Sequence, residues 1–192
     1  MESALPLARV RIAVAAGLIF FAAFPAKAVM PAVPRKSPEL TIVEPSGKQL
    51  LLTSFRGKVV LVAFIHTTCI YCQALTVKLV KLHKELGPKG FQPLAIAWNP
   101  EAPVQIPTFI REFGVQFPVG YSEWEPLRSY LGYGVLDRPV TPLVAVIDRK
   151  GFIRAEAPPD GDSNLQNEAK LRALITSLLA EGSAAPAKRT QK

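Results

Sequence analysis

Residues 58–72 read KVVLVAFIHTTCIYC, and this stretch decides how the rest of the chain is interpreted. Its apolar run from residue 59 to 65 is rich in β-branched residues, which is typical of a strand buried on both faces. The pair Cys69-x-x-Cys72 follows at once. Beyond it, apolar residues recur at helical spacing, namely Leu75, Leu79, Leu82 and Leu86. The sequence therefore predicts two thiols at the point where a buried strand ends and a helix begins.

This position gives the two thiols different chemistry. The first turn of a helix carries unpaired N–H groups and the positive end of the helix dipole. Cys69 is therefore expected to be stabilised as a thiolate, which is the nucleophile in disulfide exchange. The two intervening residues let Cys72 attack a mixed disulfide on Cys69. We expect Cys69 to be the more exposed and the more acidic of the two.

Two other interpretations of the cysteine pair explain the sequence less well. A zinc site normally needs four ligands, but the chain has two cysteines and two histidines, and His83 lies a helix length from the pair. A static disulfide that closes so small a loop would constrain the unfolded chain little. We therefore expect no metal and no cofactor, apart from a redox-active disulfide between Cys69 and Cys72.

The N-terminal residues have the pattern of an export signal. Arg9 and Arg11 precede an apolar run at 12–24, and residues 26–28 (Ala-Lys-Ala) offer small residues at the spacing of a signal-peptidase site. The apolar run is shorter than the roughly 20 residues that span a bilayer. We interpret residues 1–28 as a cleaved signal peptide that leads to the periplasm or another extracytoplasmic space. The alternative is an uncleaved N-terminal membrane anchor.

Composition and charge narrow the function further. A domain stapled by disulfides in an oxidising compartment would show several cysteines, so a single close pair fits redox chemistry better. The net charge is +8 at pH 7, with the lysines scattered along the chain. The sequence shows no basic patch interleaved with aromatic residues, which argues against a nucleic-acid partner. We expect a monomer.

The remaining patterns predict one α/β domain at 38–182, between a linker at 29–37 and a disordered tail at 183–192. Gly87 and Pro88 are expected to end the cysteine helix. The other expected elements are strands at 39–44 and 49–52 that form a hairpin, a strand at 91–98, a loop at 99–103, helices at 104–113 and 125–131, strands at 143–147 and 152–156 around a turn, and a helix at 164–180. Such an order predicts a central mixed sheet flanked by helices.

Several segments along the chain match one known pattern in order: the hairpin with Gly47, residues 55–62, Cys69-Ile70-Tyr71-Cys72, residues 113–119, Thr141-Pro142 and residues 147–153. Through them the chain resembles the thioredoxin-like superfamily. Within it, the chain is similar to the exported TlpA-like thiol-disulfide oxidoreductases and to the neighbouring redoxins and peroxiredoxins. The resemblance covers residues 37–182 and implies a thioredoxin-like fold.

The resemblance also implies a substrate site. Thr141-Pro142 matches the cis-proline loop that lies against the cysteine pair, where the backbone before proline can pair with an extended substrate segment. With Tyr71, inside the motif, it forms the expected substrate-binding residues. The implied partners are protein disulfides or dithiols and a membrane-bound or thioredoxin-type electron donor.

Three positions depart from the family pattern. Thr68 stands where the family usually has an aromatic residue, and no proline follows Cys72 in the helix. Ala63 stands where thioredoxin has a buried aspartate, so a proton acceptor must come from elsewhere. Glu101, in the loop after the second buried strand, is the candidate acceptor. His66 would lower the pKa of a neighbouring thiol if it were protonated, although such a residue is more often structural.

Three functions remain. The favoured one is a thiol-disulfide oxidoreductase that acts on exported proteins. The alternative is a peroxiredoxin-type thiol peroxidase with antioxidant activity, in which Cys69 forms a sulfenic acid and Cys72 resolves it. Peroxiredoxins usually show Pro-x-x-x-Thr-x-x-Cys, but the matching positions here are Val62 and His66. A copper-delivery protein fits least, because such relatives use Cys-x-x-x-Cys and a distant histidine.

Overall fold

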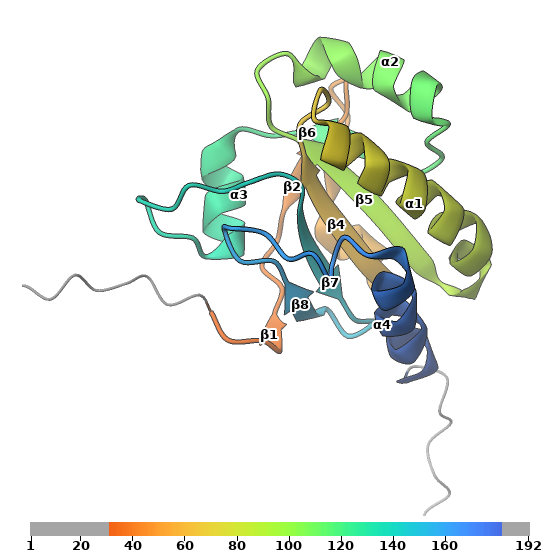
Figure 1. Cartoon of the computed structure of the whole chain (residues 1–192). Coiled ribbons are helices and arrows are strands. Elements are labelled where there is room, and N and C mark those ends of the chain that lie inside the picture. Colours follow the sequence, from red (N-terminus) through yellow and green to blue (C-terminus); the bar gives the residue numbers. More distant parts are fainter. Residues whose placement is uncertain (1–30, 182–192) are drawn as a thin grey trace, which may run out of the picture.

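The computed structural model describes residues 31–181, so the predicted signal peptide (1–28) and tail (183–192) lie outside the described residues. The strands form a mixed sheet in the order β1-β8-β7-β4-β5-β6-β2-β3 (Figure 1). They are β1 (Arg35–Lys36), β2 (Thr41–Val43), β3 (Gln49–Leu51), β4 (Val59–Ile65), β5 (Phe91–Ala97), β6 (Val119–Tyr121), β7 (Leu143–Ile147) and β8 (Phe152–Glu156). The α-helices are α1 (Ile70–Leu86), α2 (Ala102–Phe113), α3 (Trp124–Leu131) and α4 (Glu168–Glu181).

β4 is the central strand, parallel to β5 and antiparallel to β7. All seven of its residues are buried, as expected for a strand covered on both faces. Figure 1 shows α1 and α4 on one side of the sheet and α3 on the other. Phe64 of β4 meets Tyr130 of α3, with 5.9 Å between the ring centroids. The chain therefore has the predicted architecture of a mixed sheet between helices.

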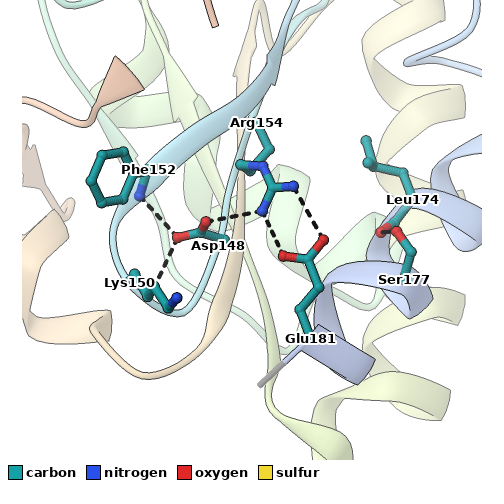
Figure 2. Close-up of polar contacts among 7 residues, drawn as sticks. All are labelled: Asp148, Lys150, Phe152, Arg154, Leu174, Ser177 and Glu181. Atoms are coloured by element: carbon teal, nitrogen blue, oxygen red, sulfur yellow. Dashed lines mark hydrogen bonds and ion pairs between the residues drawn. The ribbon is translucent and has the colours of Figure 1, made fainter. Parts of the chain in front are cut away.

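Charged pairs hold α4 to the rest of the molecule. On the outer surface, Lys81 of α1 lies 2.8 Å from Glu168 of α4. Figure 2 shows the other end of α4, where both oxygens of Glu181 accept hydrogen bonds from Arg154 of β8 at 2.6 and 3.1 Å. Arg154 also reaches Asp148 at 3.2 Å, and Asp148 accepts from the backbone N–H of Phe152 at 3.0 Å. The turn between β7 and β8 is thus tied to the last turn of α4.

The predicted linker at 29–37 is wrong in its second half. Arg35–Lys36 forms β1 and pairs with β8. The Arg35 guanidinium donates to Glu156 at 2.8 Å and to the backbone oxygen of Tyr130 at 3.0 Å. The Glu156 side chain is 1% exposed, so this ion pair is buried and fixes the segment as an edge strand. Composition did not reveal it because the partner lies far along the chain.

The predicted N-terminal hairpin is present as β2 and β3, which pair antiparallel. β2 also pairs with β6 on its other side, with Val43 opposite Tyr121. The two backbones approach closely at Gly120, where an added Cβ would lie 2.4 Å from Ile42 and 2.6 Å from the backbone oxygen of Val43. A glycine at this position lets the hairpin join the main sheet.

The predicted end of the cysteine helix is confirmed, because α1 ends at Leu86 with Gly87 as its C-cap. Gly87 keeps a right-handed conformation and begins a 3-10 helix (Gly87–Lys89), which ends at the left-handed Gly90, with φ of 100°. Two other predicted boundaries were wrong. α2 begins at Ala102, inside the predicted loop, because Pro103 is favourable in the first turn of a helix. α4 begins at Glu168 rather than at residue 164, after turns in which Asp162 accepts from the backbone N–H of Asn164 at 2.7 Å.

Candidate active site

The cysteine pair lies where β4 passes into α1, as predicted. Cys69 is the N-cap of α1, and its sulfur accepts a hydrogen bond from the backbone N–H of Cys72 at 3.4 Å. Cys72 lies in the first turn of α1 and is 0% exposed, whereas Cys69 is partly exposed. Both are free thiols. The two sulfurs are therefore close together, but solvent reaches Cys69 much more easily.

The segment before β7 faces the first cysteine. The sulfur of Cys69 lies 3.8 Å from the backbone oxygen of Thr141 and donates to it as a thiol. The peptide bond between Thr141 and Pro142 is cis. Ile70 and Tyr71, between the cysteines, are 68% and 67% exposed. The structure thus brings Cys69 and Thr141 together, and it places Tyr71 on the adjoining surface.

The surroundings of the two sulfurs shift their pKa values in opposite directions. Burial raises the pKa of Cys69, but hydrogen bonds with the side chains of Cys72 and Thr141 and with backbone N–H groups at the start of α1 outweigh it, so the net pKa is lowered. For Cys72, burial raises the pKa to about 12, and the hydrogen bond with Cys69 acts in the same direction. Cys69 is the thiol that ionises first, so it is the nucleophile that the site offers.

The structure places Glu101 at the N-cap of α2, where its side chain is exposed. Within residues 31–181 the Glu101 carboxylate makes no hydrogen bond, so it does not touch either sulfur directly. Its charge does act on His66, whose pKa it raises. Ala63, 1% exposed in the centre of β4, leaves no carboxylate at the position where thioredoxin has one.

The surroundings of His66 disfavour a positive charge on its ring. Burial lowers its pKa more than the charge of Glu101 raises it. The ring packs edge-on against Trp98, with 4.0 Å between centroids, and Trp98 stacks on Trp124 at 4.8 Å. The buried Nε2 atom of His66 has no hydrogen-bond partner among the described residues. The net pKa of His66 is lowered, so its surroundings disfavour the charged form that would lower the thiol pKa.

A buried polar network beside the cysteines was missed in the sequence. Asn99, just after β5, accepts from the backbone N–H of Thr67 at 3.0 Å and donates to the Thr67 hydroxyl and to Gln105 of α2, both at 3.0 Å. Gln73 of α1 donates to the backbone oxygen of Thr67 at 3.0 Å. One signal could have revealed it: Thr67 and Asn99 follow neighbouring parallel strands, whose ends meet at one edge of the sheet.

We searched the described residues for a group of side chains that could bind a metal ion. Residues 31–181 contain no cluster of three histidine, cysteine or acidic side chains that could hold a metal ion. His83 instead packs edge-on against Phe117, with 5.9 Å between ring centroids.

Among the helices of residues 31–181, none is long and apolar enough to cross a bilayer.

Comparison with curated proteins gives relatives of several kinds. Thiol-disulfide oxidoreductase ResA of Bacillus anthracis is 24% identical over 119 residues, which cover 62% of this chain and 65% of the relative. The SCO1 protein homolog of Bacillus subtilis is 26% identical over 91 residues, or 47% of each chain. Probable glutathione peroxidase 8 of Homo sapiens is 30% identical over 103 residues, 47% of this chain and 49% of that one. The chain thus spans 65% or less of the length of these three relatives.

Solved structures and a family model agree on the fold. A thiol:disulfide interchange protein of the thioredoxin family from Chlorobium tepidum TLS matches with a TM-score of 0.64 and 24% identity, covering 78% of this chain and 99% of that one. The thioredoxin domain of a thiol-disulfide oxidoreductase from Bacteroides vulgatus matches with a TM-score of 0.62 and 20% identity over the same shares. The Redoxin family model matches residues 27–175. With its thioredoxin-like fold and its TlpA-like sequence features, the chain belongs to the Redoxin family.

Proposed function

We propose that this protein is a thiol-disulfide oxidoreductase that exchanges disulfides of exported proteins. The observation that carries the proposal is the inequality of the two thiols. Cys69 is partly exposed with a lowered pKa, whereas Cys72 is buried with a pKa raised to about 12. One sulfur is thus available to attack a partner, and the residue that carries the other is held beside it, with the backbone N–H of Cys72 donating to the Cys69 sulfur at 3.4 Å. The name of the ResA relatives supports the same reaction class.

In the reductive direction the Cys69 thiolate attacks one sulfur of a substrate disulfide. A new S–S bond forms to Cys69, and the other substrate sulfur leaves as a thiolate. Cys72 then loses its proton and attacks the sulfur of Cys69. The Cys69–Cys72 disulfide forms, and the second substrate sulfur leaves and takes up a proton. Two electrons pass from the protein to the substrate, and the reverse sequence oxidises a dithiol.

The release step needs a base because the Cys72 thiol is almost fully protonated at neutral pH. We assign this role to Glu101, the carboxylate at the start of α2 whose charge is felt at His66. The exposed Tyr71 and the backbone at Thr141, beside Cys69, are assigned to substrate binding. A membrane-bound or thioredoxin-type donor, encountered after export, would return the oxidised pair to the dithiol form.

The test uses a variant that stops the reaction half-way. Cys72→Ser should accumulate mixed disulfides with substrate proteins in a periplasmic extract, because the sulfur that releases them is gone. Cys69→Ser is the matched control and should trap nothing. Non-reducing electrophoresis and mass spectrometry identify the trapped species. A Cys72→Ser protein that forms no adducts would reject the proposed exchange reaction.

The peroxidase is the second candidate, and the partly exposed, acidic Cys69 is the observation that favours it. The relative named probable glutathione peroxidase 8 points the same way. Against it, the position expected for the peroxidase proline is Val62, 0% exposed in β4, and the position expected for threonine is His66. Cys72→Ser mixed with hydrogen peroxide should react slowly. Rapid consumption of one equivalent per chain, with a sulfenic acid on Cys69, would favour the peroxidase.

A further inference from the structure

The turn that joins β4 to α1 is held by side chains from three other places in the fold. Thr67 is 5% exposed and occupies the middle of this turn. Its backbone N–H is bound by Asn99, its backbone oxygen by Gln73, and its hydroxyl by both Asn99 and Gln105. Every polar group of Thr67 is therefore satisfied by a side chain that lies outside the turn itself.

This arrangement controls where the first sulfur lies. Cys69 follows Thr67 by two residues, and its backbone N–H closes the turn on the oxygen of His66 at 3.2 Å. The sulfur must then lie 3.4 Å from the backbone N of Cys72 to gain the stabilisation that the start of a helix gives to a thiolate. A small rotation of the turn would change that distance, and with it the pKa of Cys69.

We propose that Asn99 is a positioning residue for Cys69: its side-chain amide fixes Thr67 and thereby places the nucleophilic sulfur at the N-terminus of α1. The inference rests on the proposed role of Cys69 as the nucleophile, and it names the residue that sets its reactivity. Asn99 lies on a different strand end and makes no contact with the sulfur, so it acts through the turn.

An asparagine suits this position because it offers an acceptor and a donor together. Its Oδ1 accepts from the backbone N–H of Thr67, and its Nδ2 donates to the Thr67 hydroxyl and to Gln105. Aspartate would keep the acceptor but would turn a carboxylate oxygen towards the Gln105 oxygen. Leucine has a similar shape but would leave the buried N–H of Thr67 without a partner, which is the costly case for a hydrogen bond.

The test compares thiol reactivity in three variants, Asn99→Leu, Asn99→Asp and Gln92→Leu. Gln92 is the matched control, because it is also 8% exposed and also donates and accepts inside the fold, but at the other end of β5, where it bonds Lys58 at 3.1 Å. The rate at which iodoacetamide modifies Cys69 in the reduced protein is measured from pH 5 to 10, with mass spectrometry to assign the site.

For Asn99→Leu we expect the pKa of Cys69 to rise, so that alkylation at pH below that pKa slows about tenfold for each unit, while the rate at high pH stays within a few-fold of the parent. In Asn99→Asp the pKa of Cys69 should lie between those of the parent and of Asn99→Leu, because the aspartate still accepts from the backbone N–H of Thr67. Gln92→Leu should leave the pH profile unchanged. A Thr67→Ser variant, which keeps every bond of the network, should behave like the parent.

An unchanged pH profile in a folded Asn99→Leu protein overturns the inference, and so does an equal shift in Gln92→Leu. If Asn99→Leu does not fold, Gln73→Leu, which removes one bond to the same turn from the surface of α1, takes its place with the same expected direction. Alkylation needs no disulfide substrate. If Cys72→Ser traps no substrate but the Asn99 variants show the expected pH profiles, the proposed function alone is rejected.

Discussion

At the residue scale, Cys69 and Cys72 carry the same thiol group and lie three residues apart, but they differ in exposure and in pKa. Cys69 lies before the first helical N–H groups with its sulfur partly open to solvent, and Cys72 lies one turn inside with none of its surface exposed. Hydrogen bonds with the side chains of Cys72 and Thr141 and with the N–H groups of the helix terminus lower the pKa of the first thiol, and burial raises that of the second. The order of events in a disulfide exchange follows from this difference.

Thiol labelling checks the division of roles directly. In the reduced protein at pH 6, iodoacetamide should modify Cys69 before Cys72, because the rate depends on the thiolate fraction and on access. Peptide mass mapping at short times should show the label on the peptide of Cys69 alone. Label appearing first on Cys72 would reverse the assignment of nucleophile and resolving thiol.

His66 makes stability depend on pH. Burial lowers its folded pKa below the value of about 6.5 that it has in an unfolded chain. The unfolded state therefore binds more protons as the pH drops below that value, so the stabilisation is complete above it and is lost as the pH falls through the folded pKa. The urea midpoint should decrease from pH 7.5 to 5.5, with a smaller decrease in His66→Phe.

The comparison of His66→Phe with the parent isolates this residue from the others that titrate nearby. Burial also lowers the pKa of His83, and it raises that of Glu156, which acts in the opposite direction. Both are present in the two proteins, so their effects cancel in the difference. An equal pH dependence in both proteins would show that His66 is not responsible.

At the element scale, local pattern predicted most strands and helices but failed where a distant partner decides. The runs at 59–65 and 143–147 are uniformly apolar and the run at 91–97 is apolar except for Gln92, and the structure has all three as buried strands. The sequence did not reveal β1, because two polar residues in a proline-rich stretch form a strand only by pairing with β8, where Arg35 also binds Glu156, 121 residues away. The predicted helix end at Gly87 is confirmed, although the left-handed conformation lies three residues further on, at Gly90.

The same contrast holds at the site. Cys69, Cys72 and Thr141 were predictable from a short motif and a family resemblance, since each is marked by its neighbours in sequence. The Thr67–Asn99–Gln105 network joins three separate elements, and nothing local distinguishes Asn99 from an ordinary loop residue. Its importance depends on burial, which only the assembled sheet creates.

The hairpin β2–β3 offers a prediction at this scale. Gly120→Ala would bring a Cβ to within 2.4 Å of the Ile42 side chain and 2.6 Å of the backbone of Val43, so the β2–β6 contact must open. We expect a loss of about 1–3 kcal/mol in the free energy of unfolding, measured by urea denaturation, as for other overpacked sites.

Gly114→Ala is a useful comparison for that variant. Gly114 has φ of 61° at the end of α2, but an added Cβ would meet nothing within 4 Å. Its cost is one of backbone conformation alone, about 1 kcal/mol. If Gly120→Ala costs no more than Gly114→Ala, close packing does not explain the glycine at position 120.

At the scale of the whole molecule, β1 near the start of the described residues and β8 near their end hold each other in place. Arg35 of β1 is bound to Glu156 at the end of β8, and Ser37 bonds the hydroxyl of Tyr130 in α3 at 2.9 Å. Three regions far apart in sequence therefore meet around one buried carboxylate. This cluster holds the edge strand β1 against β8, at the end of the sheet opposite the hairpin.

Removing the arginine should expose how much the cluster contributes. Arg35→Ala leaves Glu156 buried without its partner, and we expect a loss of about 3 kcal/mol near neutral pH. Burial already raises the pKa of Glu156, so the loss should shrink as the pH is lowered and the carboxyl takes up a proton. The double variant Arg35→Met/Glu156→Leu should regain most of the stability. A pH-independent loss would contradict this account.

Because Cys72 is buried, the reactivity of its thiol can report on local opening of α1. With Cys69 replaced by serine, a thiol reagent can reach the remaining sulfur only when the first turn of α1 opens, since that sulfur has no exposed surface in the closed form. The labelling rate then measures the free energy of that opening, as hydrogen exchange does for a single amide. A bound partner that covers the turn would be detected as slower labelling, without any added probe.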